Sequence, residues 1–166
     1  MGKEKGKVAH PKISADPSDV STIDEIIKAF YESLSYAVGK QPDYRRWRSL
    51  FHERGIVTPS KTSKDSNTTI MDVDIFIKES VENIVITGME RKGLVQTEVA
   101  RRTQAFGNIV QIFSTFEAHR SSRDLEQLPR GVYSIQLLRE NHRWWIVSIL
   151  EEIERPNLAL PKAYLV

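Results

Sequence analysis

The sequence predicts an α+β domain, and two observations support this prediction. Apolar residues recur at helical spacing in the first half of the chain, whereas from Val95 onward they alternate with a period of two. The chain has 166 residues, of which 40% are hydrophobic and 28% charged, and this composition is typical of one folded domain. Helices that precede a long antiparallel meander predict a helical layer packed on one face of a sheet.

The helices are predicted from their caps and apolar stripes. Thr22 and Glu25 form a capping box for a helix that runs along an apolar stripe to Val38 and ends at Gly39. After Gln41-Pro42, a short second helix starts at Asp43 and completes a helical hairpin. A third helix is predicted from about Val73, with Asp72 as its cap, although its β-branched residues would also suit a strand. The apolar residues of the three stripes are Ile23, Ile26, Ile27, Phe30, Leu34, Val38, Tyr44, Trp47, Leu50, Phe51, Ile75, Phe76, Ile77 and Val81.

A short strand is predicted over 55–58, an exposed polar loop over 60–69, and four longer strands over 95–106, 109–119, 132–139 and 144–153. With Gly107-Asn108 as a two-residue turn, one face of the first long hairpin carries Val99, Arg101, Thr103, Ala105, Val110, Ile112, Ser114 and Phe116. This face is the more apolar one, so we expect it to face the helices. Arg101 is then directed into the protein.

The last hairpin is read with a three-residue loop, Glu140-Asn141-His142. In that register Tyr133 shares an inward face with Trp145, Val147, Ile149 and Glu151. A two-residue loop would change which residues share a face. Trp144 and Trp145 point to opposite faces, so one should lie in the core and the other at an interface or on the surface.

The first twenty residues are expected to form a flexible basic tail outside a single domain of residues 21–166. Met1 to Lys12 contains four lysines and only Val8 and Ala9 as apolar side chains. The chain shows neither the apolar run of a secretory signal nor the roughly 18 apolar residues of a membrane span, which predicts a soluble, cytoplasmic protein without membrane contact.

Several kinds of chemistry are excluded by composition. The absence of Cys rules out disulfides, thiolate metal sites and a Cys nucleophile, and the four His are too scattered to suggest a metal site. No cofactor is predicted. A net charge of +2 argues against a dedicated nucleic-acid binder, so nucleic acid is not expected as a partner and the cluster Arg45, Arg46 and Arg48 is interpreted as solvated helix charge.

Two segments resemble a known family. The run from Phe106 to Glu117, together with Gly131–Leu137 followed by Arg143–Ile149 with its double Trp, is similar to the central strands of bacterial proteins in the nuclear-transport-factor-2-like superfamily. The order of elements fits over roughly residues 21 to 160. The chain departs from the family pattern at Glu151, where close relatives carry a Trp.

This resemblance implies a cystatin-like cone in which a curved antiparallel sheet wraps around the helical hairpin and the third helix and leaves an internal apolar cavity. It also implies a homodimer formed through the outer sheet face. The superfamily contains ketosteroid isomerase, SnoaL-type cyclases and related enzymes that perform acid/base chemistry with carboxylates, tyrosines and histidines. It contains many non-enzymatic binding domains as well, and fold alone does not carry activity.

The candidate site combines the inward charges with the expected cavity wall. Glu151 and Arg101 are the catalytic candidates, with Glu151 as base or ligand acceptor and Arg101 as carboxylate binder. The cavity-lining candidates are Tyr31, Trp47, His52 and Tyr133. Each has a structural alternative: an ion pair for the two charges, core packing for the aromatic residues and a solvated ring for His52.

Two functions follow as expectations. The first is an uncharacterised small-molecule-binding domain for a mostly apolar ligand, with room for metal-free isomerase, lyase or cyclase chemistry; the sequence does not decide whether the protein is an enzyme. The alternative is a non-catalytic dimerisation or interaction domain whose cavity is filled by side chains.

Overall fold

The computed structural model describes residues 13–61, 68–121, 123 and 126–166. It confirms the predicted α+β architecture. The elements are η1 (Pro17–Val20), α1 (Ile23–Leu34), α2 (Tyr44–Ser49), β1 (Phe51–Thr58), β2 (Met71–Asp72), α3 (Val73–Thr87), η2 (Met89–Arg91), β3 (Val95–Phe106), β4 (Ile109–His119), β5 (Gly131–Glu140), β6 (Arg143–Ile153) and η3 (Lys162–Tyr164).

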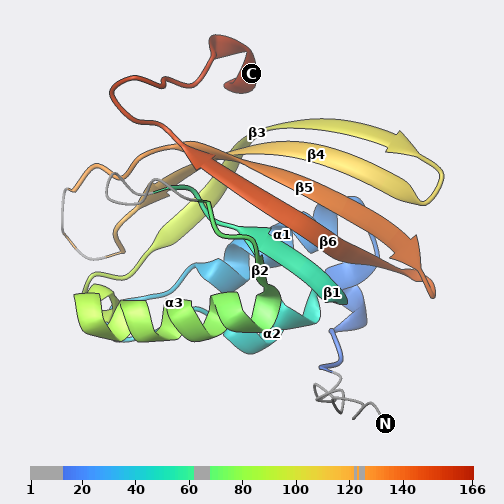
Figure 1. Cartoon of the computed structure of the whole chain (residues 1–166), viewed down its shortest axis with the longest axis horizontal. Coiled ribbons are helices and arrows are strands. Elements are labelled where there is room, and N and C mark those ends of the chain that lie inside the picture. Colours follow the sequence, from blue (N-terminus) through green and yellow to red (C-terminus); the bar gives the residue numbers. More distant parts are fainter. Residues whose placement is uncertain (1–12, 62–67, 122, 124–125) are drawn as a thin grey trace, which may run out of the picture.

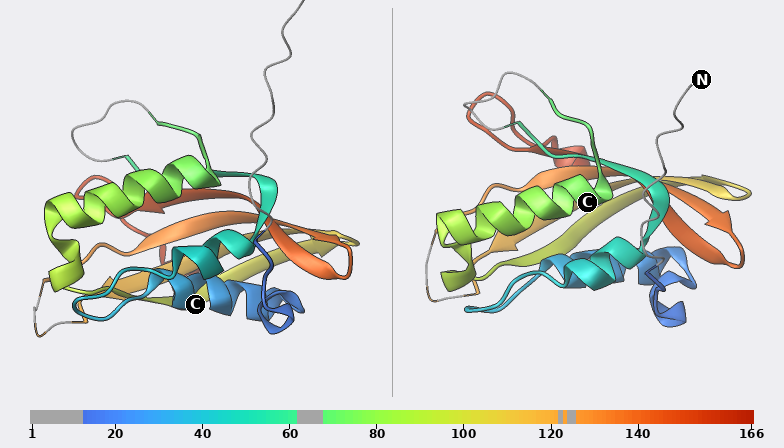
Figure 2. Two further views of the ribbon diagram at one scale, coloured as in Figure 1. Left: turned by 90° about the horizontal axis from the view of Figure 1, so that it is seen from below. Right: turned by 60° about the horizontal axis from the view of Figure 1, so that its bottom comes forward.

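The helices and the C-terminal segment lie on opposite faces of the sheet. Figures 1 and 2 show α1, α2 and α3 on the concave face of the curved strands, and Figure 1 shows the segment after β6 folded back over the outer face. The core lies between α1 and the strands. Its fully buried side chains include Ile26, Phe30, Ile112, Ile135 and Ile146.

The sheet has six strands in the order β2-β1-β6-β5-β4-β3. It is mixed rather than purely antiparallel, because β1 pairs parallel with β6. Strand β1 also begins earlier than predicted. Phe51, which the apolar spacing assigned to the second helix, is the first residue of β1, and the Ile146 N–H donates to the Leu50 carbonyl over 2.9 Å.

Helix α1 is shorter than predicted because a bridge to a distant segment replaces its last turn. Tyr36 and Leu94 exchange backbone hydrogen bonds of 2.7 and 2.9 Å. The chain is therefore extended at Ser35 and turns at Gly39, and Val38 is exposed. The predicted caps are confirmed: Thr22 accepts from the Glu25 N–H at 3.1 Å, and Asp72 accepts from the Ile75 N–H at 2.8 Å.

The domain begins earlier than the predicted boundary at residue 21. Pro17–Val20 forms a 3-10 turn, Val20 is buried in the core, and Asp19 accepts two hydrogen bonds of 2.8 Å from Arg46. The remainder of the predicted tail, residues 1–12, lies outside the described residues. Among the helices that are described, none is both long enough and apolar enough to cross a membrane.

The last hairpin contains two departures from the predicted register that cancel each other. The turn has two residues, Asn141 and His142, with φ of 54° and 61°, so Glu140 pairs with Arg143. This places Trp144 in the core and Trp145 on the outer face, which decides the question left open by the sequence and reverses the arrangement that a three-residue loop would give. A bulge then shifts the register between Gln136 and Leu137, so that Ile149 and Glu151 return to the predicted inward face.

Candidate functional site

A chain of polar side chains runs from α1 to the first hairpin inside the protein. The Tyr31 hydroxyl lies 2.6 Å from the Ser114 hydroxyl, and Ser114 donates a short hydrogen bond to Glu98. Because the single Ser114 proton is directed to Glu98, Tyr31 is the donor to Ser114. Ser114 is fully buried and Tyr31 nearly so, which makes this chain part of the interior.

Arg101 faces inward, as the register predicts, but its partners are Glu98 and Asp24 rather than Glu151. Its guanidinium donates to Glu98 over 2.9 Å and lies 2.7 Å from it through a second nitrogen. It also contacts Asp24 at 2.5 Å. The predicted pair of Arg101 and Glu151 is therefore not an ion pair. Arg101 instead fixes the carboxylate that holds Ser114 and, through Ser114, Tyr31.

Sequence reasoning missed Glu98 because of a bulge. From Phe106 back to Ala100 the strands keep the predicted register, with Arg101 opposite Ser114, but the register shifts between Glu98 and Ala100. Glu98 then lies opposite Phe116 on the inward face, and Val99, predicted to be inward, is exposed. The available signal was the inward Arg101, since buried charges are normally paired and Glu98 lies only three residues away in the sequence.

Glu151 lies beside Tyr133 near the end of the sheet where β5 begins. The two residues are register partners, and Tyr133 donates a hydrogen bond of 3.0 Å to the Gln96 side chain. Glu151 accepts the Ser60 N–H at 3.1 Å. No Lys or Arg of the described residues lies within ion-pair distance of Glu151. Within this part of the chain it is therefore a half-buried carboxylate without a counter-charge.

Both inward tyrosines are held in the protonated form. Burial raises the pKa of Tyr31 and of Tyr133 well above the ordinary value, and the negative charge of Glu151 raises the pKa of both further. Each phenol therefore remains a hydrogen-bond donor throughout the physiological pH range. The arrangement offers two neutral phenol oxygens, whose protons are donated to Ser114 and Gln96, and one carboxylate acceptor, Glu151.

We expect the tyrosines to ionise in two stages. Burial raises the pKa of four of the five, that of Tyr44 to about 12; the others are Tyr31, Tyr36 and Tyr133. A raised folded pKa means that stability is intact below pH 10 and falls as pH rises further. In a spectrophotometric titration, most of the tyrosinate absorbance should develop only once the protein unfolds. In Tyr133→Phe the unfolding step should release one tyrosinate fewer. Full ionisation of all five while the fold persists would contradict this.

Trp47 is a residue of α2, and its side chain is buried in the core. Its ring centroid is 4.4 Å from that of Phe51 and 5.2 Å from that of Phe76 on α3, which is itself only partly buried. The Trp47 indole N–H is buried and has no hydrogen-bond partner in the part of the chain that the structure describes. Trp47 thus lies next to α3 with one donor unused.

His52 is not brought into this site. Since Phe51 points into the core, the next residue of the strand points to the opposite face. There the His52 ring packs edge-on against Trp145 with centroids 5.9 Å apart, and its Nδ1 accepts the Arg54 N–H at 3.2 Å. His52 belongs to the outer face.

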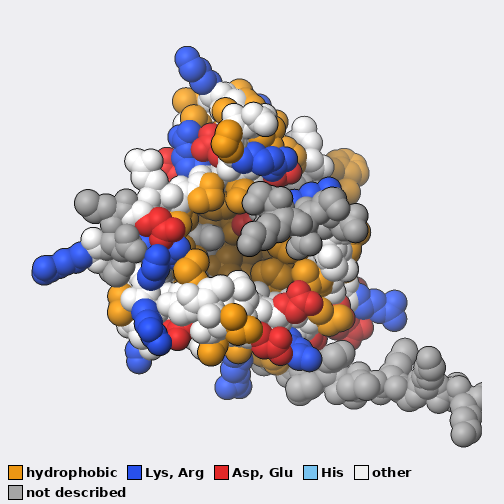
Figure 3. Space-filling model, turned by 60° about the vertical axis from the view of Figure 1, so that its left-hand side comes forward, with side chains coloured by type: hydrophobic (Ala, Val, Ile, Leu, Met, Phe, Trp, Pro, Cys, Tyr) orange, Lys and Arg blue, Asp and Glu red, His pale blue; other side chains and the backbone are white. Residues whose placement is uncertain are grey.

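The molecule is hollowed at the end where β5 begins and α3 ends. Figure 3 shows an opening at this end whose walls are formed by hydrophobic side chains and whose rim carries charged ones of both signs. The polar pair lies toward this end of the sheet, because Tyr133 is the third residue of β5 and Glu151 the third from the end of β6.

Other candidate chemistries find little support. Within the described ranges, no three His, Asp or Glu side chains are grouped so that they could hold a metal ion. Two arginines of the basic cluster on α2 form ion pairs within the protein: Arg46 with Asp19 and Glu32, and Arg48 with Asp74 at 2.8 Å. These arginines fasten α2 to its neighbours.

Comparison with solved structures shows the class of fold. A protein of unknown function with a cystatin-like fold from Nostoc punctiforme is 15% identical, with 82% of this chain and 92% of that chain covered and a TM-score of 0.63. A nuclear-transport-factor-2-like protein of unknown function from Shewanella baltica is 16% identical, with 80% and 91% covered and a TM-score of 0.54. A protein from Exiguobacterium sibiricum named as a Ca/calmodulin-dependent kinase II association domain is 10% identical, with 81% and 92% covered and a TM-score of 0.57.

The chain thus has the nuclear-transport-factor-2-like, or cystatin-like, fold that its strand motifs resemble. No family model matches the sequence, and no curated protein matches it. The shared fold carries no activity by itself.

Proposed function

We propose that the domain binds a small, mostly apolar molecule in the hollow between α3 and the concave face of the sheet, with Glu151 recognising its polar end. The observation that supports this is the Glu151 carboxylate, which is half-buried beside Tyr133 and has no Lys or Arg partner among the described residues. Removing a charge from water is unfavourable unless hydrogen bonds replace the lost hydration. A ligand hydroxyl or amine would supply such a bond.

The same groups give the site a capacity for metal-free proton transfer. Glu151 is an acceptor that can take a proton from a bound molecule, and Tyr133 is a neutral phenol beside it, whose hydroxyl is oriented by the hydrogen bond that it donates to Gln96. Arg101 is then a positioning residue, which acts through Glu98 and Ser114 on Tyr31 and does not itself touch the ligand.

The proposal is tested with two probes of similar size and shape, 2-naphthol and 2-methoxynaphthalene. Only 2-naphthol has a hydrogen-bond donor for Glu151. A charge-assisted hydrogen bond contributes about 1.5–3 kcal/mol, so we expect 2-naphthol to bind at least roughly tenfold more tightly. Glu151→Gln should remove most of this preference and leave the affinity for 2-methoxynaphthalene unchanged. Isothermal titration calorimetry measures both affinities.

Glu152→Gln is the matched control, because Glu152 is the next residue of β6, points to the opposite face and pairs with Arg155. It should preserve the preference. Equal affinity of the two probes in the unaltered protein, or loss of the preference in Glu152→Gln, would contradict a role for Glu151.

We propose homodimerisation as a second function, in keeping with the neighbour named as an association domain. The β3–β4 hairpin leaves Phe106 85% and Ile109 60% exposed at the end of the sheet that the C-terminal segment does not cover. Apolar residues of this size at one place favour contact with a partner. Sedimentation at micromolar concentration should give the mass of a dimer, and a monomer would contradict the proposal.

A further inference from the structure

The segment after β6 crosses the outer face of the sheet and is fastened at both ends. At the near end Glu154 accepts the Leu160 N–H at 2.9 Å and is itself held by Arg130 at 2.9 Å. At the far end Arg102 donates to the Ala163 carbonyl over 2.6 Å and lies over the Tyr164 ring at 5.3 Å. We call residues 154–166 the strap. Between its two attachments the strap is raised above the strands.

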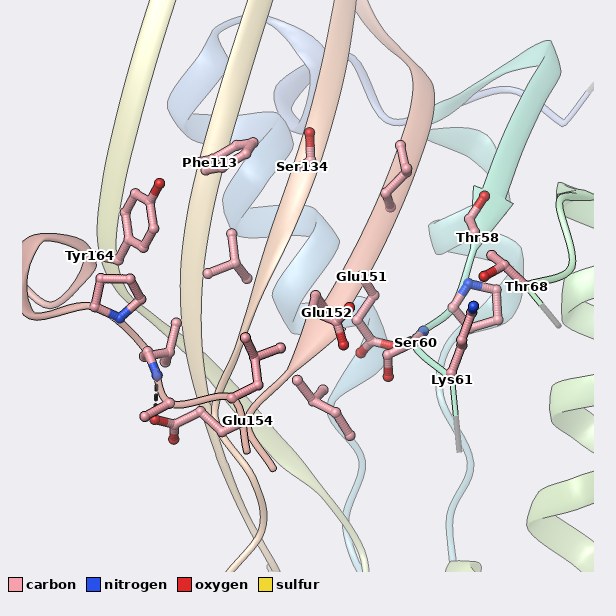
Figure 4. Close-up of a pocket in the computed structure, with 18 residues that line it drawn as sticks. Thr58, Ser60, Lys61, Thr68, Phe113, Ser134, Glu151, Glu152, Glu154 and Tyr164 are labelled. Atoms are coloured by element: carbon pink, nitrogen blue, oxygen red, sulfur yellow. Dashed lines mark hydrogen bonds between the residues drawn. The ribbon is translucent and has the colours of Figure 1, made fainter. Parts of the chain in front are cut away.

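The space beneath the strap is a groove of about 480 Å³. Its floor is a row of outward-facing residues that pair in turn across four strands: Thr58, Leu150, Ser134 and Phe113. Leu158, Leu160, Pro161 and Tyr164 of the strap form its roof, and the Tyr164 ring packs 5.9 Å from that of Phe113. Figure 4 shows Phe113 and Ser134 side by side on the strands, with Tyr164 of the strap next to Phe113.

We propose that this groove is a second small-molecule site, which lies on the outer face, borders the concave site at Glu151 and takes an uncharged apolar molecule with a polar oxygen or nitrogen. Its volume lies within the range of about 300–1,000 Å³ typical of ligand pockets. Because the strap roofs the floor and is fastened at both ends, a flat surface of another protein cannot reach that floor, whereas a small molecule can.

The chemistry of the lining selects the ligand. The Ser134 hydroxyl makes no hydrogen bond among the described residues and lies among apolar side chains, so it is available to a polar atom of a ligand. One end of the groove carries Glu151, Glu152 and Glu154, close to Ser60 and Lys61. Arg155 pairs with Glu152 and Arg130 with Glu154, so Glu151 is the carboxylate at this end that disfavours an anionic molecule such as a fatty acid.

The test uses N-phenyl-1-naphthylamine, an uncharged probe whose fluorescence rises in apolar surroundings. We expect saturable binding to the full chain, with displacement by 1-dodecanol and at least tenfold weaker displacement by dodecanoate. Ser134→Phe, which fills the groove, should raise the dissociation constant at least tenfold. Ser148→Phe is the control, since Ser148 is an outward-facing residue of β6 that does not line the groove.

Tyr164→Ala keeps the test independent of folding, because it loosens only the far attachment of the strap; it should weaken probe binding at least fivefold. Tyr133→Phe separates this site from the concave one, because Tyr133 does not line the groove. Probe binding that survives Ser134→Phe but is lost in Tyr133→Phe would overturn the proposal in favour of the concave hollow. A dimer that binds no probe, with the groove occupied by a second copy, would also overturn it.

Discussion

Replacing Glu98 by Ala is expected to lower the free energy of unfolding by about 2–4 kcal/mol. The carboxylate accepts from the buried Ser114 hydroxyl and from Arg101, whose side chain is 21% exposed. Its loss leaves the Ser114 hydroxyl, which accepts from Tyr31, without an acceptor for its own proton. It also leaves Asp24 as the remaining carboxylate partner of Arg101. Chemical denaturation followed by circular dichroism measures the change.

Two further variants show whether the charge or the shape of Glu98 matters. Glu98→Gln keeps an acceptor of the same size and should cost less than Glu98→Ala. In a double-mutant cycle with Arg101→Met, the two losses should be strongly non-additive, because both act on one network. A loss below about 0.5 kcal/mol for Glu98→Ala would place that carboxylate in solvent and contradict the network.

Gly131→Ala is expected to destabilise the domain by about 2 kcal/mol. A Cβ at this position would lie 2.6 Å from the Glu152 carbonyl oxygen and 2.7 Å from the Phe116 ring. Phe116 in turn stacks on Tyr133 with centroids 4.5 Å apart. The substitution should therefore also disturb the concave site and weaken binding of 2-naphthol.

Val132→Ala is the matched control for Gly131→Ala, since Val132 is the next residue of β5 and faces the outer side of the sheet. It should leave 2-naphthol binding unchanged. If Gly131→Ala were as stable as the unaltered protein in thermal denaturation, the close approach of Phe116 to the β5 backbone would be wrong.

The first hairpin shows how far a turn can predict a site. The two-residue turn at Gly107-Asn108 fixes the pairing of Arg101 with Ser114, and this pairing is observed. The prediction ends at the bulge before Ala100, because an extra residue in one strand leaves no mark in a period-two pattern. Glu98, the partner of Arg101, was missed for that reason alone.

The second hairpin shows the opposite case. The predicted three-residue loop was wrong, since Asn141 and His142 form the turn, and the Trp that faces the core is therefore Trp144 rather than Trp145. The inward position of Glu151 was nevertheless predicted, because the bulge near Val147 restores the register. The position of Glu151 thus depends on two compensating shifts rather than on the turn alone.

The strap could not be predicted from periodicity. Residues 154–166 contain Pro156 and Pro161 and form only an isolated bridge and a 3-10 turn. Their position is fixed by tertiary contacts with Arg130, Arg102 and Phe113, which are distant in the sequence. Local pattern carries no information on such contacts. The outer groove is therefore visible only in the structure.

The most direct test of the proposed concave site is a crystal structure of the protein with 2-naphthol bound. Our account predicts the naphthalene ring between α3 and the concave face of the sheet, with its hydroxyl oxygen within hydrogen-bond distance of Glu151 and near the Tyr133 hydroxyl. An interior filled by the protein's own side chains, with 2-naphthol bound elsewhere or not at all, would contradict the account.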